Sequence, residues 1–255
     1  MLSKQKTMEA LETMYGMFPE AHGELKHNNP FELLIAVILS AQATDVSVNK
    51  ATPDLFASFP TPDALAEASI DEIILKIKTI GLYRNKAKNI KACAQQLIER
   101  FDGQVPTSRE ELMSLPGVGR KTANVVLGDA FGIPAIAVDT HVERVSKRLR
   151  ICKLDATVME VEETLMRKVP QELWVKTHHT LIFFGRYHCG KKSQVRGMSF
   201  AINMSRWEKS DASKRKGAKK ETTPVDVVSL IANKCMNYLV IMEKSCFVYL
   251  FCMKK

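Results

Sequence analysis

A short turn with two glycines stands between two predicted helices, at Leu115, Pro116, Gly117, Val118 and Gly119. Glycine adopts positive φ without strain and, lacking a side chain, lets a phosphate group come close to the backbone. The amide groups that begin the next helix would then face that anion. Main-chain donors contact the nucleic-acid backbone rather than the bases, so such a turn suits phosphates of any sequence. For the glycines alone, an ordinary corner between two helices is the alternative interpretation.

Lys121 follows this turn and falls in the first turn of the next predicted helix. The positive end of the helix dipole disfavours an ammonium group there, so it favours the neutral amine, which is a nucleophile. Asp139 lies eighteen residues further on, after three apolar residues, and is a candidate for the charged partner that such an amine requires. Plainer roles remain open for both: Lys121 as a clamp on a bound phosphate, and Asp139 as the N-cap of a helix.

The elements that must position these residues are helices, because segment after segment opens with capping chemistry and none alternates with period two. One helix is expected from Pro30, with Asn29 as its N-cap and Glu32 completing a capping box. Further helices are expected from Pro62, from Ser69 to Gly81, from Arg84 to Arg100, from Thr107 to Leu115, from Arg120 to Phe131, and across 141–150, 157–168 and 171–184. The run 33–39 is apolar on nearly every side, which indicates a central helix. The sequence therefore predicts an all-α fold.

The sequence around the glycine turn is weakly repeated earlier in the chain. Residues 80–87 read Ile, Gly, Leu, Tyr, Arg, Asn, Lys, Ala, and residues 116–123 read Pro, Gly, Val, Gly, Arg, Lys, Thr, Ala. Each segment is predicted to contain a tight glycine turn between two helices.

Charge is divided unevenly along the 255 residues. The formal net charge is +9, yet residues 1–189 hold 23 basic and 23 acidic side chains, whereas residues 190–255 hold 14 and 5. A composition with 45% apolar and 25% charged residues is typical of a globular protein and excludes collagen-like and disulfide-scaffold classes. Because the start of 190–255 is rich in Lys, Arg, Ser and Gly, we expect an atypical basic tail with a disordered arm.

The apolar runs and the cysteines bear on the cellular compartment. No stretch of about 18 uncharged apolar residues occurs, and the first apolar run begins at Phe31, so we expect neither a signal peptide nor a membrane span. The six cysteines are expected to be free or metal-binding rather than paired in disulfides. These features predict a cytoplasmic protein that does not act at a membrane.

Three motifs together are specific to a known family. They are LPGVGRKTANVV at Leu115–Val126, AVDTHV at Ala137–Val142 and SAQATD at Ser40–Asp45. With them, the chain resembles endonuclease III, a family of base-excision DNA glycosylases and AP lyases in the helix-hairpin-helix glycosylase superfamily. The similarity runs from about Pro30 to Cys189.

This resemblance implies a fold with two lobes. A six-helix domain is expected at 23–133, with the helix-hairpin-helix at about 108–131, and a lobe made from the terminal helices at 1–22 and 134–189. Double-stranded DNA with a damaged base or an abasic site would lie across the groove between them. The resemblance also implies a nucleoid-associated monomer.

Site residues follow from the same resemblance. Lys121 would attack C1′ of the damaged nucleoside and form a Schiff base, Asp139 would assist it, and β-elimination would cut the strand 3′ to the site. An amine at 121 favours this bifunctional lyase, acting on oxidised pyrimidines, over an adenine glycosylase. The implied DNA contacts are Gln42, which fills the gap left by the flipped nucleotide, Leu82, which wedges into the duplex, and Leu115, Pro116, Gly117, Val118, Gly119, Arg120, Thr140 and His141. His178, His179 and His188 receive no role.

The end of the similar region departs from the family. Family members hold a 4Fe-4S cluster on four cysteines, and Cys189 matches the first of these ligands. The spacing then falls on Arg196, Ser199 and Ser205, which cannot replace thiolates, so a bound cluster is not expected. Because similarity, composition and charge all change at Cys189, we interpret 190–255 as a divergent or frameshifted C-terminus. A cluster-free variant of the family is the alternative.

Two other readings of the whole chain remain open. Helix-hairpin-helix turns also occur in non-catalytic DNA-binding proteins, where they only hold phosphates. A chain with an altered C-terminus could also be the inactive product of a damaged gene. The pair of Lys121 and Asp139 favours the enzyme.

Overall fold

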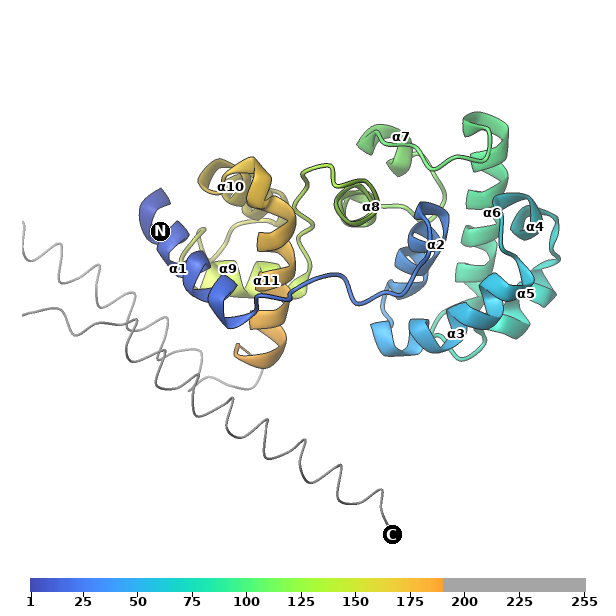
Figure 1. The fold of residues 1–255 in the computed structure, drawn as a ribbon, viewed down its shortest axis with the longest axis horizontal. Helices are drawn as coiled ribbons and strands as arrows, with labels where there is room; N and C mark the ends of the chain where they lie inside the picture. Colours follow the sequence, from blue (N-terminus) through green and yellow to red (C-terminus); the bar gives the residue numbers. More distant parts are fainter. Residues whose placement is uncertain (190–255) are drawn as a thin grey trace, which may run out of the picture.

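A computed structural model describes residues 1–189, which form helices and connecting turns without a strand (Figure 1). The helices are α1 (Lys4–Met17), α2 (Pro30–Ser40), α3 (Asp45–Ser58), α4 (Pro62–Glu67), α5 (Ile70–Ile77), α6 (Tyr83–Phe101), α7 (Arg109–Met113), α8 (Arg120–Phe131), α9 (Thr140–Arg148), α10 (Val158–Lys168), the 3-10 helix η1 (Gln171–Leu173) and α11 (Trp174–Tyr187). The all-α prediction is confirmed. None of these helices is both long and apolar enough to cross a membrane. The basic tail expected at 190–255 lies outside the described residues.

Side-chain caps set where several helices begin. The side-chain oxygen of Asn29 accepts a hydrogen bond from the backbone N of Glu32 at 2.9 Å and caps α2. Ser69 and Glu72 form a reciprocal capping box on α5. In α2 the expected box is wrong in detail, because the Glu32 carboxylate accepts from the backbone N of Asn28 at 2.7 Å, one residue before the cap. Each such cap stabilises its helix by about 1 kcal/mol.

One lobe is built around α2. All nine residues from Phe31 to Leu39 are buried, as expected for a helix that is apolar on every side. Helix α2 packs against α3, α6 and α8, and each buried Leu or Ile contributes about 1.5–3 kcal/mol. Within the described chain, α2 to α8 make seven helices where the resemblance implied six, and α7 is only five residues long.

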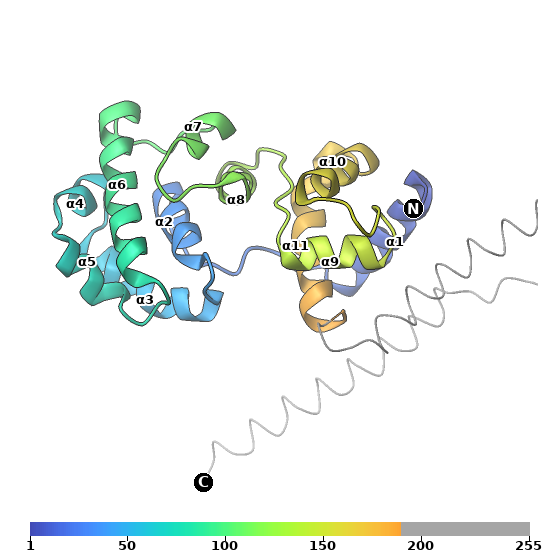
Figure 2. The same ribbon diagram turned by 180° about the vertical axis from the view of Figure 1, so that it is seen from behind.

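The other lobe joins the two ends of the described chain. Leu11 and Met14 of α1 are fully buried, in a core shared with Val142 of α9, Leu165 of α10 and Leu181 of α11. Figures 1 and 2 place α1, α9, α10 and α11 on one side, α2 to α7 on the other, and α8 between them. The two-lobed fold is confirmed, and the domain boundaries given above remain a prediction.

Candidate active site

A cavity of about 550 Å³ lies where the two lobes meet. Its wall includes Lys121 of α8, Asp139 at the start of α9, and residues 21–25 of the segment that joins α1 to α2. The structure therefore brings the two predicted catalytic residues to the wall of one cavity. A lysine side chain and a carboxylate at the same wall can support nucleophilic chemistry on a bound group.

The turn between α7 and α8 needs its two glycines for different reasons. Gly117 has a φ of +79°, and a Cβ there would lie 3.1 Å from side-chain atoms of both Asn89 and Ile38. Gly119 has a φ of −95°, and a Cβ there would meet no protein atom within 4 Å. Gly117 therefore shapes the turn, whereas packing does not demand a glycine at 119. Gly119 is the N-cap of α8 and supplies no side-chain cap to its first amides.

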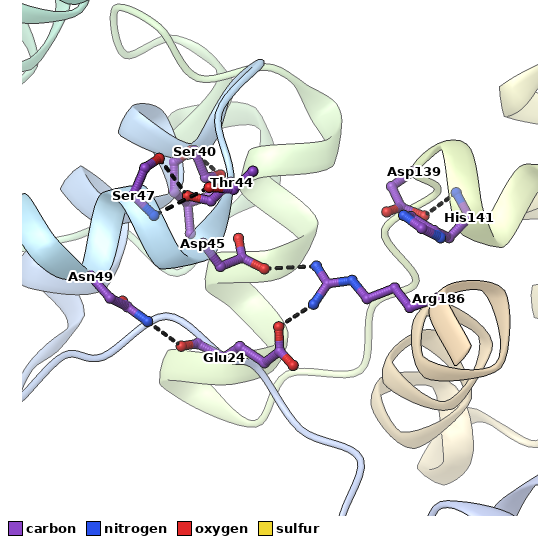
Figure 3. A network of polar contacts seen from close by, with 10 residues as sticks. Glu24, Ser40, Thr44, Asp45, Ser47, Asn49, Asp139, His141 and Arg186 are labelled. Atoms are coloured by element: carbon purple, nitrogen blue, oxygen red, sulfur yellow. Dashed lines mark hydrogen bonds and ion pairs between the residues drawn. The ribbon is translucent and has the colours of Figure 1, made fainter. Parts of the chain in front are cut away.

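Lys121 is exposed and stands in the first turn of α8, as the sequence predicted. Asp139 is the N-cap of α9, and its Oδ1 accepts hydrogen bonds from the backbone N of His141 and of Val142, each at 2.8 Å (Figure 3). The capping role considered for Asp139 is therefore confirmed. Two amide donors fix the position of its carboxylate at the cavity wall, so capping and a chemical role are compatible in one side chain.

Gln42 and Leu82 share an unusual backbone conformation. Their φ angles are +53° and +59°, and among the described non-glycine residues only two others have positive φ. A Cβ at Gly81 would lie 3.9 Å from the carbonyl oxygen of Gln42, so the two turns are neighbours. A left-handed conformation costs an L-residue about 1–2 kcal/mol, and such strain concentrates at functional sites. Both side chains are exposed, Leu82 by 58%.

Thr140 and His141 start α9 directly after Asp139. Thr140 is exposed, whereas His141 is partly buried against α11, where a Cβ at Gly185 would lie 2.9 Å from its Cβ. A guanidinium nitrogen of Arg144 lies 3.2 Å from Nδ1 of His141 and donates to the Gly185 carbonyl at 2.9 Å. Burial lowers the pKa of His141, and neighbouring arginines add to this effect, while Asp139 opposes it. His141 therefore helps to join α9 to α11.

Arg186, which sequence reasoning did not single out, joins the two lobes at the cavity (Figure 3). Its guanidinium forms ion pairs with Asp45 at 2.7 Å and with Glu24. Asn49 donates to the carbonyl of Glu24 at 2.8 Å and so holds the joining segment on α3. Burial disfavours the charged form of Arg186, but the two carboxylates outweigh it and raise the pKa. The partners are 141 and 162 residues away in the chain, so no local pattern points to them.

A second clasp between the lobes uses Arg120, one of the implied DNA contacts. Its Nη2 and Nε donate to the carboxylate oxygens of Glu162 at 2.9 and 3.0 Å, and the Glu162 side chain is only 3% exposed. This hydrogen bonding raises the pKa of Arg120. Asn124 donates to the carbonyl of Ile136 at 2.8 Å beside it. A contact of Arg120 with DNA stays a prediction.

Cys189, the one family-matching cluster ligand, is 3% exposed. Arg148 donates to its Sγ at 3.2 Å, and Arg144 donates to its carbonyl at 3.2 Å. Within the described part of the chain, no group of three or more His, Cys, Asp or Glu side chains could hold a metal ion. The endonuclease III family normally carries a 4Fe-4S cluster. The other three ligand positions lie outside the described residues.

The donor chemistry at those four positions does not fit a cluster. Arg196, Ser199 and Ser205 offer no sulfur, so Cys189 would be the only thiolate. No catalytic step is therefore derived through iron. The expectation that no cluster is bound stays a prediction.

Comparisons with known proteins define the class. Residues 35–171 match the family described as HhH-GPD superfamily base excision DNA repair protein. A solved non-covalent endonuclease III–DNA complex is 53% identical, with a TM-score of 0.76, over 82% of this chain and 100% of that chain. A trapped endonuclease III–DNA covalent intermediate is 58% identical, with a TM-score of 0.74, over 76% of this chain and 91% of that chain.

The family within this class is also shown. Endonuclease III of Bacillus subtilis (strain 168) is 57% identical over 193 residues, which are 76% of this chain and 88% of that protein. The chain belongs to the endonuclease III family, whose members are bifunctional DNA glycosylases and AP lyases. The resemblance carried by the three motifs is confirmed, and a purely phosphate-holding protein is not favoured.

Proposed function

We propose that this base-excision glycosylase and AP lyase uses Lys121 as its nucleophile and Asp139 as the assisting carboxylate. The observation that carries the proposal is their placement at one cavity between the lobes. Lys121 also stands directly after the glycine turn, where bound DNA would bring the sugar within reach. The partner is double-stranded DNA with a damaged base or an abasic site, and the solved endonuclease III structures that the chain is similar to are complexes with DNA. We place the protein in the cytoplasm, at the nucleoid, as a monomer.

The reaction proceeds at the sugar of a nucleotide that has left the base stack. Oxidised, non-planar pyrimidines cost least to extrude, so they are the proposed substrates. The Lys121 amine attacks C1′, the bond from C1′ to the base breaks, and its electron pair leaves with the base. Opening of the sugar ring gives an imine between Lys121 and C1′. The imine makes the C2′ proton acidic, and its removal expels the 3′ phosphate and cuts the strand.

Asp139 acts on the charge of this amine. An ammonium cannot attack C1′, because it has no free electron pair, so a proton must leave Lys121 before the bond forms. A carboxylate held in place at the same cavity wall can take that proton and stabilise the positive charge that develops on the sugar. The two hydrogen bonds to the start of α9 keep the carboxylate in place during these steps.

The proposed DNA contacts are of two kinds: amides that bind the phosphate backbone, and side chains that enter the duplex. The amides of the 115–119 turn and of the first turn of α8 bind backbone phosphate, aided by the open space at Gly119. Leu82 and Gln42 reach the duplex from neighbouring turns, and the strain in their backbones supports a functional use. Thr140 and His141 lie close to the flipped nucleotide.

Borohydride trapping on an oligonucleotide with one abasic site tests the nucleophile. The reagent reduces the imine to a stable amine, so the wild-type chain becomes covalently attached to DNA. We expect Lys121→Ala to abolish the adduct and to slow strand cleavage by about 10⁴-fold or more. Lys176→Ala is the matched control, since Lys176 is a second exposed lysine at the same cavity. Trapping that survives in Lys121→Ala would show that another amine forms the imine.

Asp139→Asn separates the chemical role of this residue from its capping role. Asparagine is as good an N-cap as aspartate, so the melting temperature should stay within a few degrees of wild type. Loss of the carboxylate should slow base release by about 100-fold. Asp139→Ala should also lose about 1 kcal/mol of stability with the cap. Full activity in Asp139→Asn would reduce Asp139 to a cap.

A further inference from the structure

A second pair of ionisable side chains lines the active-site cavity and takes no part in the mechanism above. His179 of α11 lies with its Nε2 at 2.7 Å from Oδ1 of Asp129 in α8. Their side chains are 8% and 12% exposed, and both belong to the cavity wall that carries Lys121 and Asp139. A histidine paired with a carboxylate inside a substrate cavity is an arrangement that can hold and transfer a proton.

The chain packs tightly around this pair of side chains. A Cβ at Gly23 would lie 2.7 Å from Oδ2 of Asp129 and 3.6 Å from Cε1 of His179, so only a glycine backbone fits against it. Helices α8 and α11 also approach closely here, because a Cβ at Gly128 would lie 3.1 Å from Val175. The pair therefore packs against the backbone of Gly23, at a place where α8 and α11 lie close together.

The neighbouring His178 adds no positive charge beside this pair. Its ring centre lies 4.7 Å from that of His179, and it is hydrogen-bonded to the backbone of Ala137. Burial, together with His179, lowers the pKa of His178 to about 4. His178 is thus neutral near pH 7 and places no positive charge beside His179, whose Nε2 faces the Asp129 carboxylate.

The steps at the sugar do not supply a proton to the departing base. When the bond from C1′ to the base breaks, the base carries away the electron pair and becomes a poor, anionic leaving group unless it receives a proton. In the proposed mechanism Lys121 and Asp139 act at C1′, so neither of them protonates the base. An acid at the part of the cavity that receives the base would lower this barrier.

We propose that His179, supported by Asp129, donates the proton that the departing base takes up. This inference rests on the proposed function. As the bond from C1′ to the base breaks, the proton moves from the His179 nitrogen that does not face Asp129 to the base. The product is a neutral base beside a neutral imidazole, which still donates through Nε2 to Asp129. Strand cleavage at an abasic site needs no such proton, because no base is present there.

The test compares two substrates with one set of variants. Duplexes carry either an oxidised pyrimidine or an abasic site at the same position, and base release and strand cleavage are measured under single turnover. We expect His179→Gln to slow base release by about 100-fold and to leave abasic cleavage and borohydride trapping within about twofold. Asp129→Asn should act in the same direction with a smaller loss. His188→Gln, at a histidine that follows α11 and does not line the cavity, is the matched control and should behave as wild type.

The leaving group gives a readout that a purely structural role would not move. Oxidised pyrimidines with a more acidic ring nitrogen leave more readily as anions, so the deficit of His179→Gln should shrink with them. Equal losses on the damaged and abasic duplexes would overturn the proposal and reduce the pair to a clasp between α8 and α11. Unchanged base release in both variants would overturn it as well. A wild-type chain that traps no abasic DNA would instead contradict the proposed function on which this rests.

Discussion

The two glycine turns of the first lobe use a left-handed backbone in opposite ways. Between α7 and α8 the positive φ falls on Gly117, and the turn is pressed against Asn89 and Ile38. Between α5 and α6 it falls on Leu82, whose side chain is 58% exposed. A side chain is excluded in the first turn and presented outward in the second. Similar sequence patterns thus make one turn suited to close approach of a backbone and another suited to insertion of an apolar side chain.

Alanine substitutions at the central glycines should separate the two turns most strongly. Gly117→Ala adds a strained φ and a contact at 3.1 Å, so we expect it to lower the free energy of unfolding by about 2–3 kcal/mol. Gly81→Ala is the matched control. Its added Cβ would make only an ordinary contact at 3.9 Å, and its φ is not positive, so the loss should stay below about 0.5 kcal/mol. Denaturant unfolding measures both.

Equal losses in these two variants would contradict the distinction between the turns. A small loss for both would mean that the 116–119 turn relaxes away from α2 and α6. A large loss for both would mean that Gly81 is as constrained as Gly117. Either result would weaken the assignment of the 116–119 turn as the rigid phosphate-binding element.

Local chemistry explains what could be predicted from the sequence. The caps at Asn29 and Ser69, the glycine turn and the position of Lys121 in the first turn of α8 all depend on residues within a few positions of one another. The cap at Asp139 could likewise be predicted, because the amides that donate to an N-cap side chain are those of the next few residues. Motifs of this kind predict the fold class and carry the proposed nucleophile.

Contacts between distant residues could not be predicted in the same way. Arg186 with Asp45, and His179 with Asp129, join residues 141 and 50 positions apart, and each pair forms only when the lobes meet. The positive φ of Gln42 and Leu82 was also hidden, since neither residue type favours that conformation. These contacts at the cavity thus depend on tertiary packing, and the pair of His179 and Asp129 could not be predicted for this reason.

Substitution of Leu82 should trade activity against stability. Leu82→Gly removes both the wedge and the strain, so we expect stability to rise by about 0.5–1 kcal/mol while base release from duplex DNA falls about tenfold. Leu82→Ala should lose activity to a similar extent without the gain in stability, because its backbone remains strained. Thermal unfolding and single-turnover base release provide the two measurements. Full activity in Leu82→Gly would mean that the exposed side chain does not enter the duplex.

The smallest effects are expected at Gly119, where the protein itself leaves room for a side chain. Gly119→Ala should weaken DNA binding about fivefold on damaged and undamaged duplexes alike, because the methyl group obstructs a phosphate that is bound without regard to sequence. Gly119→Ser distinguishes this effect from weaker capping of α8, since serine is a better N-cap than alanine but carries the same Cβ. Binding in salt titrations should be equally weak in both variants. If Gly119→Ser bound as tightly as wild type, capping rather than phosphate approach would account for the glycine, and the turn between α7 and α8 would owe its function to Gly117 alone.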